Sequence, residues 1–190
     1  LEFLILTAAR SGEVRTATWD EIDLEAQVWT VPADRMKAGK AHRVPLSEDV
    51  ITLLKGLPRA ESALVFPAPR GGVISDMTIS KVAKRMDEAS PEKDGPGYRD
   101  PTTGRVVVPH GFRSSFKDWA RSSTSYADEV SELALAHVNS DATRSAYARD
   151  ELMPQRARLM REWAGFLAVP VPAASVTPIR GQDAESTFSA

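Results

Sequence analysis

Apolar residues dominate the first nine positions, and this pattern predicts a helix over residues 1–9 that is buried on most sides. A short second helix is expected after Arg10, with Ser11 as its N-cap, because serine can accept a hydrogen bond from a free backbone N–H. Short runs rich in strand-forming residues follow, separated by turn-prone stretches. They predict three strands of one small antiparallel sheet, at residues 21–23, 28–31 and 42–46.

Beyond the sheet the apolar positions change to a helical period. They predict six further helices, at residues 48–57, 76–89, 109–120, 128–136, 141–149 and 154–168. Ser47 is a suitable N-cap for the first of these, Ser75 or Asp76 opens the second, and Pro109 suits the start of the third. Inward-facing side chains are expected on two of them: Met77, Ile79, Val82, Ala83 and Met86, and then Leu159, Trp163 and Phe166.

The remaining stretches lack such a period. Residues 90–104, rich in Gly, Pro and charge, predict a loop, and residues 169–190 have the composition of a tail without a fixed fold. The expected fold class is therefore α+β, mainly helical with a small three-stranded antiparallel sheet. A chain of 190 residues, 42% of them hydrophobic, can bury one core, so a single domain over residues 1–168 is expected.

The first residues and the composition of the chain limit the cellular location and the kinds of site that are expected. The chain starts inside an apolar helix without an initiator Met, so upstream segments of a longer protein are expected. The absence of cysteine excludes disulfides and thiolate metal sites. No apolar run approaches the length of a membrane span and no signal segment opens the chain, so the cytoplasm is the expected location and no membrane partner is expected.

Charge is distributed unevenly. The net charge of −2 argues against a protein that simply coats DNA. Two basic stretches nevertheless stand out: Arg35, Lys37, Lys40 and Arg43, and then Arg99, Arg105, Arg113, Lys117 and Arg121. Acidic residues gather elsewhere, which fits one face that meets a polyanion but also fits ordinary charge scatter.

Several polar residues have both a functional and a structural interpretation. His110 and Arg113 lie three residues apart on one predicted helix, about 5–6 Å from each other at Cβ. Such a pair indicates a phosphate site, or else two side chains that are solvated separately. Arg10 at the end of a buried helix needs a partner, and Glu13 is the nearest candidate. This ion pair could be structural or functional.

Three further residues carry little information by themselves. Lys37 lies where a strand enters a Gly-containing turn, and most hairpin lysines are solvated edge residues. Tyr147, ten residues after His137, would normally be a half-buried packing residue, and His137 would normally be a core histidine.

Taken in order, these residues resemble the tyrosine recombinases, and most closely the integrases of prophages and genomic islands. The resemblance runs over residues 1–168. It is carried by residues 7–13 (TAARSGE), 36–37 (MK) with 42–47 (HRVPLS), 110–113 (HGFR), 135–137 (LAH) and 146–147 (AY), and it continues through 149–150, 158–160 and 163–164. It implies a catalytic domain that is preceded, in the whole protein, by an arm-binding and a core-binding domain.

The resemblance also implies roles. Tyr147 would be the nucleophile that forms a 3′-phosphotyrosine, with Arg10 and Arg113 on the phosphate. His110 would accept the tyrosine proton or hold the phosphate, Lys37 would protonate the 5′-oxygen, and His137 would donate a hydrogen bond to the phosphate. Glu13 would support Arg10. Predicted DNA contacts are Arg35, Lys40 and Arg43. No metal, ATP or other cofactor is expected.

The expected function is site-specific recombination for the integration or excision of a prophage or genomic island. The expected partner is double-stranded DNA at attachment sites, bound by four protomers, with accessory DNA-bending or directionality proteins. The isolated chain is expected to be a monomer, and its tail either disordered or docked on a neighbouring protomer. The alternatives are a relaxing topoisomerase of the same chemistry, a DNA-binding remnant without catalysis, and a metal-dependent nuclease.

Overall fold

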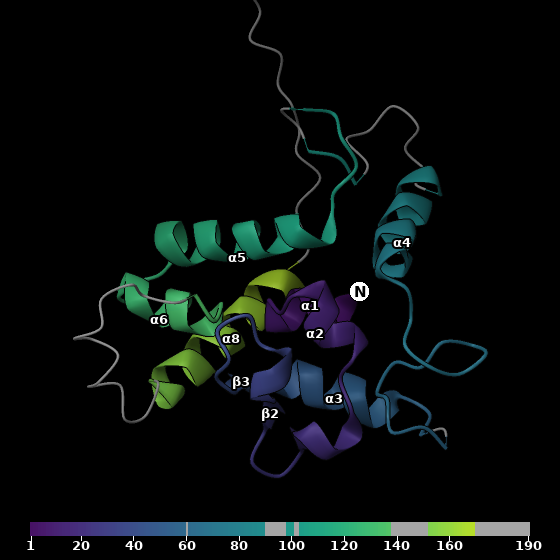
Figure 1. The fold of residues 1–190 in the computed structure, drawn as a ribbon. Helices are drawn as coiled ribbons and strands as arrows, with labels where there is room; N and C mark the ends of the chain where they lie inside the picture. The colour runs from purple at the N-terminus through teal and green to yellow at the C-terminus, as the bar shows by residue number, and fades with distance from the viewer. Residues whose placement is uncertain (60, 90–97, 101–102, 138–151, 170–190) are drawn as a thin grey trace, which may run out of the picture.

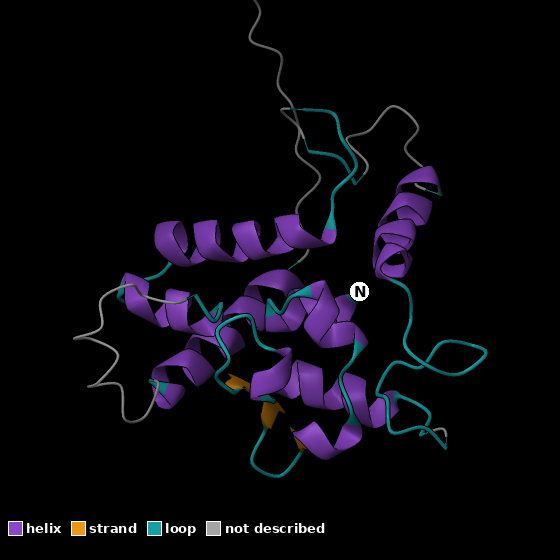
Figure 2. Ribbon diagram, viewed as in Figure 1, coloured by secondary structure: helices purple, strands orange, loops and turns teal. Residues whose placement is uncertain are grey.

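The structure is a computed structural model that describes residues 1–59, 61–89, 98–100, 103–137 and 152–169. These residues form a mainly helical fold with one small sheet, as predicted (Figures 1 and 2). The elements are α1 (Glu2–Thr7), α2 (Ser11–Arg15), η1 (Trp19–Glu21), β1 (Ile22–Asp23), β2 (Val28–Val31), η2 (Ala33–Arg35), β3 (His42–Pro45), α3 (Glu48–Gly56), α4 (Asp76–Glu88), α5 (Pro109–Ser123), α6 (Asp128–Ala134) and α8 (Met153–Ala168). The predicted helix at 141–149 lies outside the described residues.

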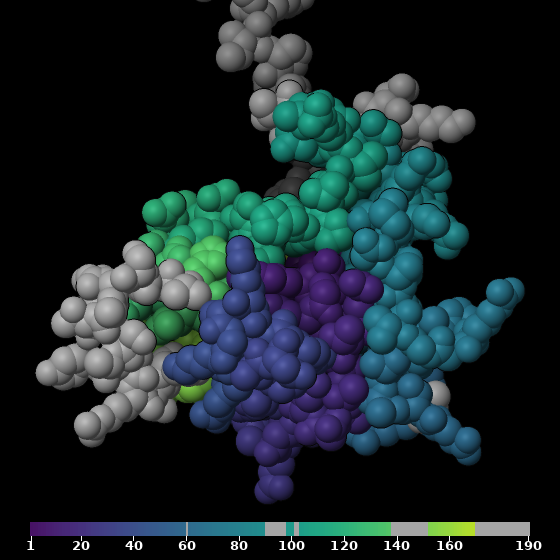
Figure 3. Space-filling view, viewed as in Figure 1, coloured from purple at the N-terminus to yellow at the C-terminus, as the bar shows by residue number. Residues whose placement is uncertain are grey.

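The sheet has the order β1-β2-β3, and both pairs are antiparallel. Trp29 lies opposite Val44, and Val31 lies opposite His42, so the predicted three-strand arrangement is confirmed. The connection between β2 and β3 contains η2 and Gly39, whose φ of 64° suits a residue without a Cβ. This connection stands out from the surface beside the first two helices (Figure 3). It carries Lys37.

Two buried clusters form the core. The first lies between α1, the sheet and α3, and includes Phe3, Trp29 and Leu54. The second lies between α5, α6 and α8, and includes Phe116 and Trp163. Helix α1 packs against α3, α5 and α8, so its C-terminal end lies where the two clusters meet. This end leads directly to Arg10. No helix among the described residues is long and apolar enough to cross a membrane.

Several expectations about burial are wrong. Met77 and Met86 of α4 are 56% and 37% exposed, and only Ile79 and Ala83 of the predicted stripe are buried. Helix α4 lies at the side of the molecule and packs mainly against α2, which covers only part of its apolar face (Figure 1). Phe166 of α8 is 52% exposed, although its ring stacks on the ring of Trp163 at a centroid distance of 5.6 Å.

The N-cap of α2 also differs from the prediction. Arg10, not Ser11, precedes the helix with an extended backbone, and Ser11 is the first helical residue. The cause is Glu13, whose carboxylate accepts a hydrogen bond from the Arg10 backbone N–H at 2.8 Å. By contrast, Ser47 caps α3 as predicted, because its Oγ accepts from the Val50 N–H at 3.4 Å.

The described part of the predicted loop at 90–104 contains local structure. Arg99 pairs with Val106 in an antiparallel bridge, and the Val107 N–H donates to the Tyr98 carbonyl at 2.8 Å. The guanidinium of Arg99 donates to the Asp87 carboxylate at 2.6 Å. This small hairpin therefore ties the segment before α5 to α4.

Trp163 is expected to be the most sensitive position of the second cluster. Its side chain is 2% exposed, and its indole N–H donates to the Ile5 carbonyl at 2.9 Å. Trp163→Ala should lower the free energy of unfolding by about 3–5 kcal/mol, measured by urea denaturation. Phe166→Ala is the matched control on the same helix, and it should cost about 1 kcal/mol or less because Phe166 is half exposed. Equal losses for the two variants would contradict this core assignment.

Candidate active site

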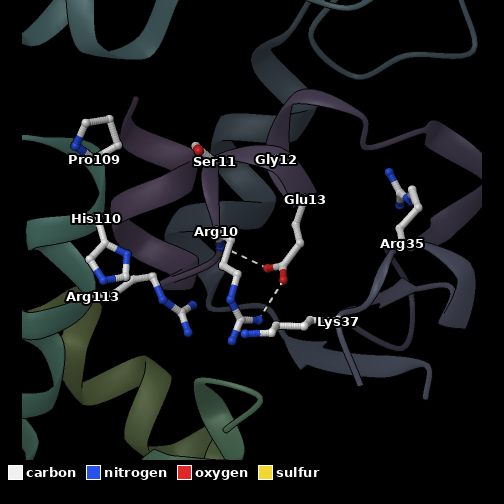
Figure 4. Close-up of a pocket in the computed structure, with 9 residues that line it drawn as sticks. All are labelled: Arg10, Ser11, Gly12, Glu13, Arg35, Lys37, Pro109, His110 and Arg113. Carbon is white, nitrogen blue, oxygen red and sulfur yellow. Dashed lines mark hydrogen bonds and ion pairs between the residues drawn. The ribbon is translucent and has the colours of Figure 1, made fainter. Parts of the chain in front are cut away.

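A hollow of about 380 Å³ opens where three distant segments meet (Figure 4). The segments are the start of α2, the connection between β2 and β3, and the start of α5. The lining residues are Arg10, Ser11, Gly12, Glu13, Arg35, Lys37, Pro109, His110 and Arg113. Four of the six predicted catalytic residues, together with Glu13, therefore line one hollow.

Arg10 enters the hollow from a sharp turn after α1. Ala8, the residue at the C-terminal end of α1, has a left-handed backbone with φ of 49°, which redirects the chain. The Arg10 guanidinium donates to Glu13 Oε1 at 2.8 Å, and the same carboxylate accepts the Arg10 backbone N–H. Glu13 is buried, whereas the Arg10 side chain is 34% exposed. Glu13 therefore orients Arg10 and leaves part of the guanidinium open to the hollow.

Arg113 approaches from the first turns of α5, which begins at Pro109. Its side chain is buried, and its guanidinium donates to the Ala8 carbonyl and, at 2.6 Å, to the Leu135 carbonyl. Burial and the charge of Arg10 lower the pKa of Arg113 to about 10, while Glu13 acts in the opposite direction. Arg113 thus remains charged at neutral pH but has lost much of its hydration.

The two arginines meet at one backbone carbonyl. The Leu135 oxygen accepts from Arg113, and it lies 3.4 Å from a terminal guanidinium nitrogen of Arg10. Glu13 forms an ion pair with Arg10, whereas Arg113 is held by backbone carbonyls and feels Glu13 only through its charge. Such a partly dehydrated excess of positive charge is a favourable environment for an anion with several oxygens.

His110 and Lys37 add to this excess at the edge of the hollow. Both residues are exposed. The imidazole of His110 lies beside Arg113, and the ammonium of Lys37 is turned toward Arg10 (Figure 4). The hollow therefore has the composition expected of a phosphate site, with donors that arrive from different directions.

Two predicted catalytic residues are not among those that line the hollow. His137 follows Leu135 and Ala136 directly, but its ring is paired with Glu132, at 2.8 Å between Nδ1 and Oε2. Its side chain is 44% exposed. Tyr147 lies outside the described residues, so its place relative to the arginines stays a prediction.

The predicted DNA contacts differ from one another. Lys40 and Arg43 are exposed. Arg35 lines the hollow, but its guanidinium points away from the other cations and forms an ion pair with Glu21 (Figure 4). It also donates to the Thr16 backbone and side chain. These contacts link η2 to η1 and to the segment before it, and the DNA contact of Arg35 stays a prediction.

Comparison with known proteins identifies the family. Residues 1–152 match the model of the phage integrase family. The chain belongs to the phage integrase family. Two similar members are the prophage integrase IntA of Escherichia coli K12, 32% identical over 167 residues, and the integrase of Enterobacteria phage P4, 30% identical over 180 residues. Each match covers 86% of this chain but only 37% and 38% of the respective relative, so the chain spans well under half of their length.

Solved structures show the same fold at low sequence identity. The XerA recombinase matches with a TM-score of 0.51 and 14% identity, over 88% of this chain and 57% of that one. The Tn1549 transposon integrase in complex with transposon right end DNA matches with a TM-score of 0.52 and 16% identity, over 84% and 56%. The fold predicted for this integrase-family chain is therefore confirmed.

Some residues of this family member were not found by sequence reasoning. Lys117, counted above with a basic stretch, is largely buried and forms ion pairs with Asp128 at 2.8 Å and Glu132 at 2.5 Å. The backbone carbonyls of Ala8 and Leu135, which hold Arg113, leave no signal in a sequence. Among the residues described, no three or more His, Asp or Glu side chains are grouped so that they could hold a metal ion.

Proposed function

We propose that this chain is the catalytic part of a site-specific DNA recombinase that integrates or excises a prophage or genomic island. The observation that carries the proposal is the pairing of Arg10 and Arg113 around one hollow, with Lys37 and His110 at its edge. Membership of the phage integrase family supports it, as do relatives that are named prophage integrases. Those names also favour recombination over strand relaxation by a topoisomerase of the same chemistry.

The two arginines would bind the phosphodiester that is cleaved. A phosphodiester is anionic and gains charge on its non-bridging oxygens as it becomes pentacoordinate. Arg10 and Arg113 approach from different elements, and each can donate two N–H groups to these oxygens. Because their backbone and Glu13 contacts already orient them, little reorganisation is needed when the charge develops.

Tyr147 would supply the nucleophile. Its phenolic oxygen attacks phosphorus, the bond from phosphorus to the 5′-oxygen breaks, and a 3′-phosphotyrosine and a 5′-hydroxyl result. The hydroxyl has a reference pKa near 10, so a proton acceptor assists its attack, and His110 is the residue we assign to this step or to holding the phosphate. Lys37 would give its proton to the departing 5′-oxygen. His137 would donate a hydrogen bond to the phosphate.

Rejoining is the reverse reaction, in which a 5′-hydroxyl attacks the phosphotyrosine. The covalent intermediate conserves the energy of the broken bond, so the reaction requires no ATP, and the proposed steps use no metal ion. We assign this chemistry to residues 1–168 as one catalytic domain. Four copies of the whole protein would assemble on two attachment sites in double-stranded DNA.

The proposal is tested by trapping the covalent intermediate. The protein is incubated with a nicked attachment-site duplex. Cleavage releases a short fragment with a 5′-hydroxyl, and its loss by diffusion prevents rejoining. A denaturing gel should then show a protein–DNA adduct that protease removes. Strand exchange between two differently labelled duplexes would separate recombination from relaxation. If DNA is cleaved without an adduct, and a chelator stops this cleavage, the protein is a metal-dependent nuclease instead.

The predicted DNA contacts can be separated by salt titration. Lys40→Ala and Arg43→Ala should each weaken binding to mixed-sequence duplex DNA and reduce the slope of log K against log salt by about 1. Arg35→Ala should instead lower the free energy of unfolding by about 2 kcal/mol, because it leaves the largely buried Glu21 carboxylate without its cation. A changed salt slope for a folded Arg35→Ala protein of normal stability would show that Arg35 contacts DNA.

A further inference from the structure

A second set of charges lies next to the hollow and joins α5 to the end of α6. Glu132, on α6, is bonded through one carboxylate oxygen to Lys117 at 2.5 Å and through the other to His137 Nδ1 at 2.8 Å. Lys117 also donates to Asp128 at 2.8 Å and to the Ser131 hydroxyl at 2.7 Å. Lys117 is 13% exposed, so this arrangement is partly shielded from solvent.

The protonation of Glu132 decides which way the hydrogen bond to His137 runs. Burial alone would raise the pKa of Glu132, but hydrogen bonds from Lys117 and His137 and their charges outweigh it, and the pKa lies below its usual value. Glu132 is therefore an ionised carboxylate at neutral pH, and a carboxylate can only accept. Nδ1 of His137 must then be the donor.

We propose that Glu132 is a positioning residue that accepts the Nδ1–H of His137. His137 can then donate a hydrogen bond to a phosphate only as the imidazolium. The proposal rests on the proposed function, because it concerns the hydrogen bond that His137 gives to the scissile phosphate. Lys117 fixes the other carboxylate oxygen and thereby the direction in which Glu132 holds the ring.

The number of N–H groups on the His137 ring decides whether it can bind both Glu132 and a phosphate. A neutral imidazole carries one N–H, and with the hydrogen on Nδ1 the Nε2 nitrogen presents a lone pair. A lone pair repels a phosphate oxygen, whereas the imidazolium has a donor on each nitrogen. A neutral ring held in this way should therefore give no hydrogen bond to the phosphate.

The turn that carries His137 also contacts Arg10 and Arg113 of the hollow. Ala136 has a left-handed backbone with φ of 49°, and the His137 N–H donates to the Glu132 carbonyl at 3.0 Å. Leu135 and Ala136 offer their carbonyls to the two arginines. Within the described residues, the charged groups that contact His137 or this turn, directly or through one another, are Glu132 and Asp128 from α6, Lys117, Arg113 and Arg121 from α5, Arg10 before α2, and Glu13 on α2.

The first test reads the tautomer in the free wild-type protein. The ring ¹⁵N chemical shifts of neutral His137 should show the hydrogen on Nδ1, and the chain has only three histidines to assign. In Glu132→Gln the amide can donate to Nδ1, so a population with the hydrogen on Nε2 should appear. Glu129→Gln, on the same helix, is the matched control and should leave the tautomer unchanged. A neutral wild-type ring that carries its hydrogen on Nε2 overturns the proposal.

The second test follows adduct formation on nicked attachment-site DNA across pH. At mildly acidic pH, Glu132→Gln should cleave about tenfold more slowly than wild type, because it lacks the carboxylate that holds the His137 ring. The difference should shrink as pH rises, because the neutral His137 ring of the variant can still donate from Nε2. In a His137→Phe background, Glu132→Gln should have an effect that does not change with pH. A ratio of Glu132→Gln to wild-type rates that is constant across pH would indicate a merely structural role and overturn the proposal.

The two tests also separate this proposal from the proposed function. If wild-type protein forms no adduct at any pH, the recombinase assignment fails. The tautomer of His137 then decides by itself whether Glu132 holds the ring through Nδ1.

Discussion

Tyr147→Phe is expected to abolish covalent attachment to DNA while leaving DNA affinity nearly unchanged. The substitution removes one oxygen atom, which is the atom that would bond to phosphorus, and it keeps the aromatic ring. The assignment rests on the position of Tyr147 ten residues after His137 in the tyrosine recombinase pattern. A nicked duplex and a denaturing gel measure the adduct, and a gel shift with intact duplex measures affinity.

The chain provides its own controls, because it contains only three tyrosines. Tyr126 donates its hydroxyl to Glu162 at 2.7 Å, and Tyr98 is half exposed on the hairpin before α5. Tyr126→Phe and Tyr98→Phe should both retain the adduct. An adduct formed by Tyr147→Phe, or lost in one of the other two variants, would show that a different residue is the nucleophile.

Lys37→Ala is expected to slow cleavage of bound DNA by about 10²–10⁴-fold, the usual contribution of a general acid. Lys37 extends from the connection between β2 and β3 toward Arg10, where a 5′-oxygen would leave (Figure 4). Replacing the bridging 5′-oxygen with sulfur isolates this step, since a thiolate leaves without a proton. Cleavage of the sulfur substrate by Lys37→Ala should recover toward the wild-type rate, measured in single turnovers at saturating DNA.

Lys40 provides the comparison for Lys37 because it lies on the same turn, three residues further along. Lys40→Ala should bind DNA more weakly but cleave bound DNA at a nearly normal rate with either substrate. If sulfur fails to restore cleavage by Lys37→Ala, or restores cleavage by Lys40→Ala instead, Lys37 is not the general acid.

The features that followed from the sequence are those set by local periodicity. The strands at Val28–Val31 and His42–Pro45 have strand-forming residues between turn signals, and α3 begins directly after a serine that caps it. Spacing placed His110 beside Arg113 on one helix, but it could not group this pair with Arg10 and Lys37, which are far from it in the chain. The grouping of all four followed only from the family resemblance, and the hollow brings the four residues together.

What the sequence missed depends on contacts between distant segments. The ion pair of Arg35 with Glu21 joins two elements, so local spacing gave no sign of it, and the DNA contact of Arg35 stays a prediction. Phe166 has the right helical phase for burial, but it lies near the end of α8 and is 52% exposed among the described residues. The carbonyl of Leu135 is backbone, and every residue has one, so nothing in its side chain marks it as the meeting point of two arginines.

The position of α8 at the C-terminal end of the described fold has a consequence for biosynthesis. This helix supplies Leu159 and Trp163 to one buried cluster and Ala164 to the other, and Arg156 donates to the Arg43 carbonyl at 2.5 Å. A ribosome releases Tyr147 before it releases these residues. Until α8 has emerged, neither cluster is complete, and the helices that hold the two arginines lack their full packing. We therefore expect a nascent chain to be unable to cut DNA before α8 has emerged from the ribosome.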